Sequence, residues 1–216
     1  MKRRDLLGTA LVAAFGGCTG EVKEPTTTPT PSPADTTTTD SPTPDANQPV
    51  YEATDQRHVA LDGEPFSELR IDVLLEAVPF AGEVELEEQP ADGEDGILRI
   101  GLHNRDNRPW AIHAAVPLPF PPAGSDGGLW VSETRAPGAE GGCARGPAAA
   151  DGAYSRKQLP PDERIEGIRY IHALNDTSTC YKTGTHSFRN RYDVYDDLEA
   201  DQPRRRFRWG FSLVVD

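Results

Sequence analysis

The sequence predicts an all-β protein, an antiparallel β-sandwich that follows a disordered stalk rich in Thr and Pro. Two observations favour strands. Several segments alternate apolar and polar residues with a period of two, and no window shows a clear apolar period of 3.6 residues. In addition, 20 Gly and 20 Pro among 216 residues are too many for a helical bundle and suit short strands joined by turns.

The alternating segments place the strands along the chain. In order, they are expected at 69–75, 98–104, 110–116, 129–131, 168–174 and 207–215. A turn-rich segment, 104–109, separates the second from the third, so these two are predicted to form a hairpin with one buried face. The stretch 135–161 is rich in Gly, Ala and Pro and is expected to be a long loop.

The first 17 residues have the features of an export signal. A basic start is followed by an apolar run of about ten residues, which at about 1.5 Å per residue is too short to cross roughly 30 Å of hydrocarbon as a helix. Residues 1–17 are therefore predicted to be a signal peptide. The adjacent Arg3 and Arg4 favour the twin-arginine (Tat) export route over ordinary positive charge before the apolar run.

The signal ends in a sequence that resembles a lipobox. It reads Phe15-Gly16-Gly17-Cys18, with Phe15 where the usual form has Leu. The thiol of Cys18 is predicted to carry the lipid, and the two chains of a diacylglycerol would hold the protein on the membrane. The alternative is a cysteine that happens to follow the signal. With lipid attached, the protein is expected on the extracytoplasmic face of the cell membrane.

Residues 18–49 are expected to be a lipidated, disordered linker. From Thr19 to Pro49 there are ten Thr and seven Pro, and Val22 is the one large apolar residue. Such a segment cannot bury enough surface to offset its chain entropy. Its composition suits an extended, O-glycosylated stalk, although an unmodified spacer has the same sequence. Residues 50–216 then form the single folded domain.

Three residues of this domain are candidates for covalent modification. If Cys18 carries lipid, Cys143 and Cys180 remain, and an exported chain usually joins such a pair in a disulfide. The bridge would contribute roughly 3–4 kcal/mol by chain-entropy scaling. Free thiols and metal ligands are the competing interpretations. Asn175 begins a possible N-glycosylation sequon, and the alternative there is an unmodified turn.

The charge balance bears on partners and on environment. There are 35 Asp and Glu against 22 Lys and Arg, a net charge of −13, which argues against a nucleic-acid partner because phosphates would be repelled. Four Lys against eighteen Arg, with the excess of acids, fits a halophilic protein. In molar salt the Debye length is about 3 Å, so acidic runs such as 92–95 are expected to be a solvated surface.

Motifs for catalysis or metal binding are sparse. We find no Gly-x-Ser-x-Gly, no His-Glu-x-x-His and no Walker loop, while a Ser/His/Asp triad assembled from distant positions stays open. Cys180 and His186 match part of a blue-copper set, but the only methionine is Met1. We expect no metal and no cofactor.

Three further histidines have ordinary explanations. His103 and His113 fall on the same outward face of the predicted hairpin, where two histidines on facing strands could share a metal, although surface residues are the more common finding. His172 lies in an apolar strand and is expected to be a satisfied core group.

Six segments of the chain form a recognisable series: LRIGLHN (98–104), PFP (119–121), GC (142–143), LPPDE (159–163), CYKTGTHSF (180–188) and WGFSLVV (209–215). Taken in order, they resemble the lipid-anchored, immunoglobulin-like secreted proteins of salt-loving archaea and, more distantly, the sandwich of bacterial intracellular proteinase inhibitors. The resemblance implies an immunoglobulin-like order of strands over about 69–215 and assigns no inhibitory residue. Relatives usually have Gly at the position of Asp162 and often Tyr at that of His186.

The leading functional hypothesis is a cell-surface lipoprotein that presents a non-catalytic sandwich for adhesion, ligand binding or envelope interaction. Its partner would be a protein, a glycan or a small molecule, since sandwiches host many functions on one scaffold. The alternatives are a metal- or small-ligand-binding accessory of a transport or redox system, and a small extracellular hydrolase.

Overall fold

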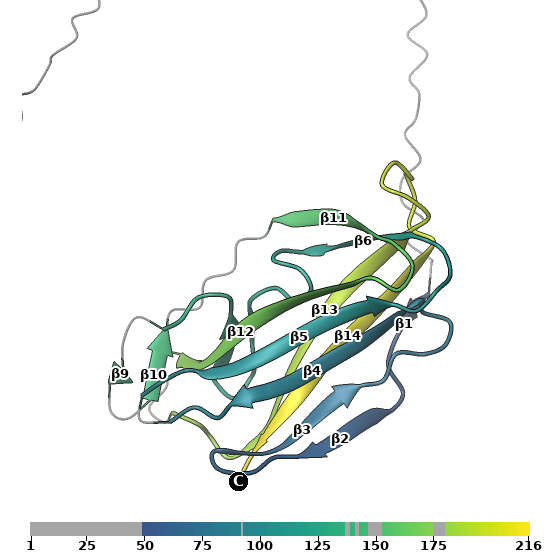
Figure 1. Ribbon diagram of the computed structural model, residues 1–216. Helices are drawn as coiled ribbons and strands as arrows, with labels where there is room; N and C mark the ends of the chain where they lie inside the picture. Colours follow the sequence, from purple (N-terminus) through teal and green to yellow (C-terminus); the bar gives the residue numbers. More distant parts are fainter. Residues whose placement is uncertain (1–48, 92, 137–138, 141–142, 147–152, 175–179) are drawn as a thin grey trace, which may run out of the picture. The chain divides into compact units, whose positions relative to one another are not determined.

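The computed structural model describes residues 49–91, 93–136, 139–140, 143–146, 153–174 and 180–216 (Figure 1). The signal peptide with Arg3 and Arg4, the linker with Cys18, and Asn175 lie outside the described residues, so these assignments stay predictions. Among the residues that the structure describes, none form a helix with the length and apolar character that crossing a membrane requires.

Strands and turns make up the described residues, with no helix among them. The strands are β1 (Val50–Tyr51), β2 (Gln56–Ala60), β3 (Phe66–Asp72), β4 (Phe80–Glu88), β5 (Gly96–Asn104), β6 (Trp110–Ala115), β7 (Ala123–Gly124), β8 (Leu129–Ser132), β9 (Ala139–Glu140), β10 (Cys143–Gly146), β11 (Tyr154–Leu159), β12 (Arg164–Leu174), β13 (Gly184–Tyr195) and β14 (Arg205–Val215).

These strands form two sheets packed face to face, which confirms the predicted β-sandwich. The first sheet, sheet A, has the order β11-β6-β13-β14-β3-β2, and β1 adds to β14 in parallel. The second, sheet B, has the order β4-β5-β12-β10-β9, with β8 paired to β12 and β7 to β8. The pairing is antiparallel apart from β1 with β14 and β10 with β12. In Figure 1, β4, β5 and β12 lie in front of β13 and β14.

The core between the sheets is centred on β14. Its alternate residues Phe207, Trp209 and Phe211 are at most 1% exposed, as the sequence pattern predicts. Trp209 also reaches across to sheet B, where a Cβ atom on Gly82 of β4 would lie 2.0 Å from the indole. A glycine at this position therefore allows the two sheets to approach each other closely.

The predicted hairpin of 98–104 and 110–116 is wrong. β5 pairs with β4 and β12 in sheet B, whereas β6 pairs with β11 and β13 in sheet A. Buried Asn104 holds the segment in which the chain passes from sheet B to sheet A. Its Nδ2 donates to the backbone carbonyls of Arg108, Leu159 and Pro160 at 2.9–3.0 Å. Apolar alternation reports which face of a strand is buried but not which strand is its neighbour, so the sequence pattern fits both arrangements.

Two further expectations need correction. The stretch expected to be a long loop contains β11, an edge strand of sheet A whose only buried residue is Leu159. In β12 the buried face is the opposite one: Ile171 is buried and Ile168 is 37% exposed. The buried face also holds Arg169, whose guanidinium donates to the backbone carbonyls of Phe120 and Pro117, at 2.6 and 2.9 Å. These hydrogen bonds offset the free-energy cost of burying the Arg169 charge, which the apolar alternation predicts to be exposed.

Candidate functional site

A groove follows the open edge of the sandwich, between the edge strands β2 of sheet A and β4 of sheet B. It holds two cavities, of about 600 and 180 Å³, and Arg57 of β2 lines both. The larger is lined by Arg57, Val59, Leu61, Leu69, Glu83, Val84, Glu85, Leu86, Arg99, Gly101, Arg164 and Glu166. The smaller is lined by Arg57, Ile71, Asp72, Val73, Leu74, Ala81, Gly82 and Arg105.

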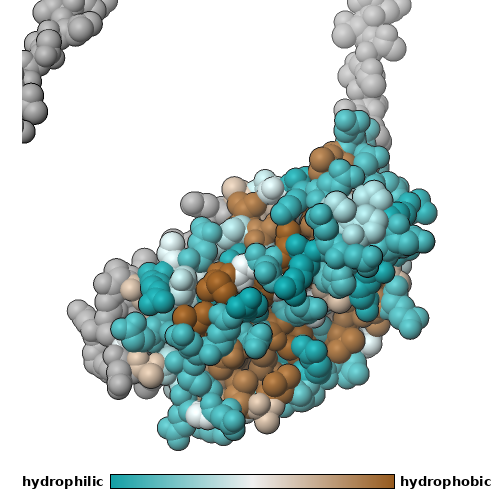
Figure 2. All heavy atoms as spheres, in the orientation of Figure 1, coloured by the Kyte–Doolittle hydropathy of each residue, from teal (hydrophilic) through white to brown (hydrophobic). Residues whose placement is uncertain are grey.

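The larger cavity has an apolar floor. Leu69 and Val84 are buried there, Leu61 and Leu86 are half-buried, and Val59 is 36% exposed. Figure 2 shows apolar surface gathered between β4 and β3, with hydrophilic side chains around it. Apolar surface of this kind in a hollow, bordered by polar groups, is the usual composition of a ligand site.

Gly101 keeps the outer part of this cavity open. It lies in β5 opposite Glu83 of β4 and Glu166 of β12. A Cβ atom at Gly101 would have its nearest neighbours at 3.6–3.9 Å, which is ordinary van der Waals contact. A larger side chain can therefore be introduced here, and it would enter the cavity.

Most charges on the rim of the larger cavity are already paired. Arg164 forms ion pairs with Glu83 and Glu166, at 3.5 and 3.2 Å, and Arg99 binds Glu87. Arg57 differs from these arginines, because its side chain has no ion pair or hydrogen bond within the described part of the chain. A ligand could therefore bind the Arg57 guanidinium without breaking an existing contact.

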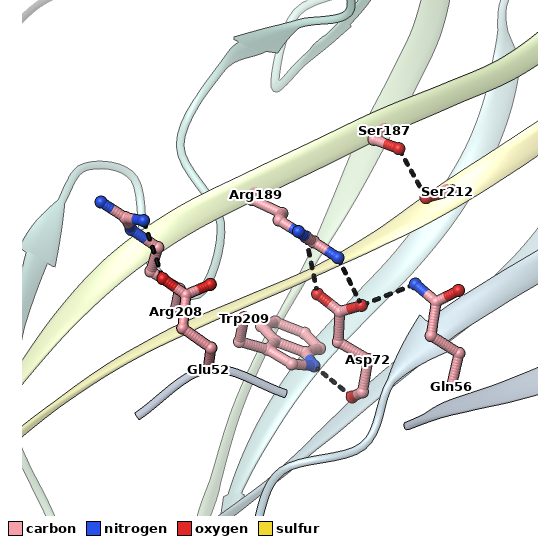
Figure 3. Close-up of polar contacts among 8 residues, drawn as sticks. All are labelled: Glu52, Gln56, Asp72, Ser187, Arg189, Arg208, Trp209 and Ser212. Carbon is pink, nitrogen blue, oxygen red and sulfur yellow. Dashed lines mark hydrogen bonds and ion pairs between the residues drawn. The ribbon is translucent and has the colours of Figure 1, made fainter. Parts of the chain in front are cut away.

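The carboxylate of the smaller cavity, that of Asp72, is already hydrogen-bonded within the protein. Asp72 is 3% exposed, and its carboxylate accepts hydrogen bonds from Nε2 of Gln56 at 2.8 Å and from Nε of Arg189 at 3.2 Å. Its backbone carbonyl accepts Nε1–H of Trp209 at 3.1 Å. Figure 3 shows these contacts between β2, β3, β13 and β14. They fix this end of the groove and leave the carboxylate little capacity for a ligand.

Further polar pairs lie beside this cluster in sheet A. Ser187 and Ser212 bond through their hydroxyls at 2.9 Å, and Arg208 pairs with Glu52 at 2.8 Å (Figure 3). Each pair joins neighbouring parts of the sheet, so we assign them a role in stability.

A serine and a histidine do meet, at the turn between β7 and β8. Nε2–H of His186 donates to the backbone carbonyl of Lys182 at 2.6 Å, so Nδ1 is free to accept the hydroxyl of Ser125 at 3.0 Å. Ser125 Oγ in turn accepts N–H of Leu129 at 3.1 Å. His186 is 2% exposed, its ring is covered by Gly127, and neither cavity reaches it.

This contact holds a turn in place. A nucleophile needs access for its substrate, and here the base is buried. Because both ring nitrogens of His186 are hydrogen-bonded, the ring is also not available as the copper ligand considered from the sequence.

His172 is buried as expected, but it is not satisfied. It is 2% exposed, and its Nδ1 has no hydrogen-bond partner among the residues that the structure describes; Oδ1 of Asp95, which lies 3.7 Å away, also lacks one there. Burial lowers the pKa of His172 to about 4 and raises the pKa of Asp95. Both groups are thereby shifted toward their neutral forms.

Asp95 was missed from the sequence, where it is part of an acidic run expected to be solvated. It is 7% exposed, and its Oδ2 accepts the backbone N–H of Ala136 at 3.0 Å. Only its place directly before an apolar strand could have distinguished it from the exposed Glu94.

The remaining predicted positions do not come together. His103 and His113 lie in different sheets, so they cannot share a metal as facing residues of a hairpin. No group of three or more His, Cys, Asp or Glu side chains in the described ranges is placed to hold a metal ion. Cys143 begins β10 and Cys180 precedes β13, but the side chain of Cys143 lies outside what the structure describes. The disulfide stays a prediction.

No family model, no curated protein and no solved structure matches this chain.

Proposed function

We propose that this protein is a lipid-anchored cell-surface protein whose sandwich is a non-catalytic binding module, and that the groove between β2 and β4 receives its ligand. The observation that carries the proposal is the cavity of about 600 Å³ with an apolar floor and a charged rim. Its volume falls within the range of small-molecule sites, about 300–1,000 Å³. The anchor would be Cys18, and the linker would hold the groove away from the membrane.

The groove favours binding over hydrolysis. Its acids and bases lie on the rim, and most of them are consumed in ion pairs such as Arg164 with Glu83. Ser125 and His186 meet outside both cavities. A binding module requires no more than this groove and a stable scaffold.

Accessibility of the groove is tested with the neutral apolar dye Nile red and the full chain under native conditions. The wild-type protein should enhance the fluorescence of the dye, and Gly101→Phe should weaken the enhancement because its ring would occupy the outer part of the cavity. Lys157→Phe, which adds the same ring at an exposed position of β11, is the matched control and should behave as wild type. If wild type and Gly101→Phe give equal signals, the groove is not the binding site.

The anchor is tested in the cell. Cys18→Ser should release the protein into the medium, whereas the neighbouring Thr19→Ser should leave it in the membrane fraction. Replacement of both Arg3 and Arg4 by Lys should block twin-arginine export and leave the precursor inside. Retention of Cys18→Ser on the membrane would refute lipidation at this residue.

A further inference from the structure

We propose that the ligand of the groove is a free, single-chain anionic amphiphile. Its carboxylate or phosphate head would bind at Arg57 and Arg105, and its apolar chain would lie along the floor of the larger cavity. This inference rests on the proposed function, since it names the ligand class for the same groove.

The position of the head follows from the charges of the smaller cavity. Its two cations are Arg57 and Arg105, and its one acid, Asp72, is already bound by Arg189. Arg105 uses one nitrogen to donate to the carbonyl of Val78 at 3.3 Å, which leaves its other N–H groups available. In a chain of net charge −13, this end of the groove is locally positive.

Guanidinium groups suit such a head. Each presents several N–H donors in a plane, and a carboxylate or a phosphate accepts two of them at once. Both arginines are exposed, so a ligand reaches them from solvent. A head bound here pairs Arg57, whose side chain has no partner among the described residues, unlike Arg99 and Arg164 of the same lining.

The direction of the chain follows from the lining of β4. Ala81 and Gly82 line the smaller cavity, and residues 83–86 line the larger one, so the two cavities succeed each other along the strand. The floor next to the arginines is apolar, with Leu69 and Val84 buried beneath it. Exposed Glu85 lies at this second end and would repel an anionic head. The head therefore belongs beside Arg57 and the apolar chain beside β4.

The proposal is tested by calorimetry on the full chain with three probes that share one apolar chain: decanoate, decanol and decyltrimethylammonium, each below its micelle concentration. Decanoate should bind about tenfold more tightly than decanol, because charge-assisted hydrogen bonds are added, and decyltrimethylammonium should bind most weakly. Arg57→Gln should weaken the binding of decanoate toward that of decanol, with Arg105 retaining part of the difference, and should leave decanol unchanged. Arg208→Gln removes an exposed arginine from sheet A and is the matched control.

Three other outcomes would overturn the proposed ligand class. Equal binding of the three probes would show that the groove selects apolar chains without regard to charge, which overturns this inference and leaves the proposed function intact. Binding of none of them also overturns it, and the dye experiment with Gly101→Phe then decides the proposed function. If Arg57 is needed for sedimentation with phosphatidylglycerol vesicles while decanoate does not bind, the anion is a bilayer headgroup and the free amphiphile is wrong.

Discussion

Mild acid should destabilise the fold through His172. Burial lowers the pKa of this imidazole from 6.5 to about 4, whereas in the unfolded chain it returns to its ordinary value. Between pH 6.5 and 4 the unfolded state therefore binds a proton that the folded state does not. The free energy of unfolding must fall as the pH is lowered through this window.

The size of the effect follows from the two pKa values. Each pH unit between them is worth 1.36 kcal/mol, so the full difference corresponds to about 3 kcal/mol. Asp95 acts in the opposite direction. Its folded pKa is raised, so its contribution to stability is present at low pH and is lost as the pH rises through that folded pKa. Glu68 and Asp106, whose folded pKa values are lowered by hydrogen bonds, also contribute to the slope of the wild-type protein, so a variant of His172 is needed to isolate its share.

The assay is urea denaturation at a series of pH values from 7.5 to 4. The unfolding free energy of His172→Gln should depend less on pH than that of wild type, with a difference of about 3 kcal/mol accumulated between pH 6.5 and 4. His103→Gln, which changes a histidine that is not buried, should keep the wild-type slope. If His172→Gln and wild type have parallel profiles, the buried imidazole is not the group that titrates and the reasoning fails.

Three further predictions concern backbone and covalent structure. Gly82→Ala should lower the unfolding free energy by about 1–3 kcal/mol, because its Cβ would lie 2.0 Å from an indole of β14. Gly101→Ala, whose Cβ has neighbours no nearer than 3.6 Å, should melt close to wild type. Equal melting temperatures for both variants would contradict the close approach of the sheets. Asp162 has φ 60°, in the left-handed region, so Asp162→Ala should be less stable than wild type by about 1 kcal/mol. Asp162→Gly should match or exceed the stability of wild type in chemical denaturation. The reverse order of the two variants would argue against a left-handed turn. Intact mass measurement after alkylation without reductant should find Cys143 and Cys180 unmodified, and alkylation of both thiols would exclude the bridge.

The sequence predicts the fold best where one face of a strand is wholly apolar. β14 is such a strand, and the alternation of Phe207, Trp209 and Phe211 identifies its buried face correctly. The same rule fails in β12, because Arg169 lies on the buried side and is paired there with backbone carbonyls. Those carbonyls belong to a segment about fifty residues away, and nothing local in the sequence marks them as acceptors.

The groove could not be predicted in the same way. It lies between edge strands of two different sheets, and the choice of edges depends on strand order, which periodicity does not encode. Arg57 and Val59 belong to a short, mostly exposed strand that was not expected at all. The sequence places Gly101 within the expected strand 98–104, and only the pairing of β5 with β4 and β12 shows that it leaves space between two side chains.

The attachment of β1 has a mechanical consequence. This strand joins the sandwich through two residue pairs, Val50 with Arg206 and Tyr51 with Phe207, while β13 and β14 are matched over the eleven positions from Gly184 to Val194. A pulling force transmitted through the preceding chain reaches β1 before any other strand. Because only two residue pairs carry this load, β1 should detach before the longer pairing of β13 with β14 is disturbed, and the chain that precedes β1 would lengthen by a few residues.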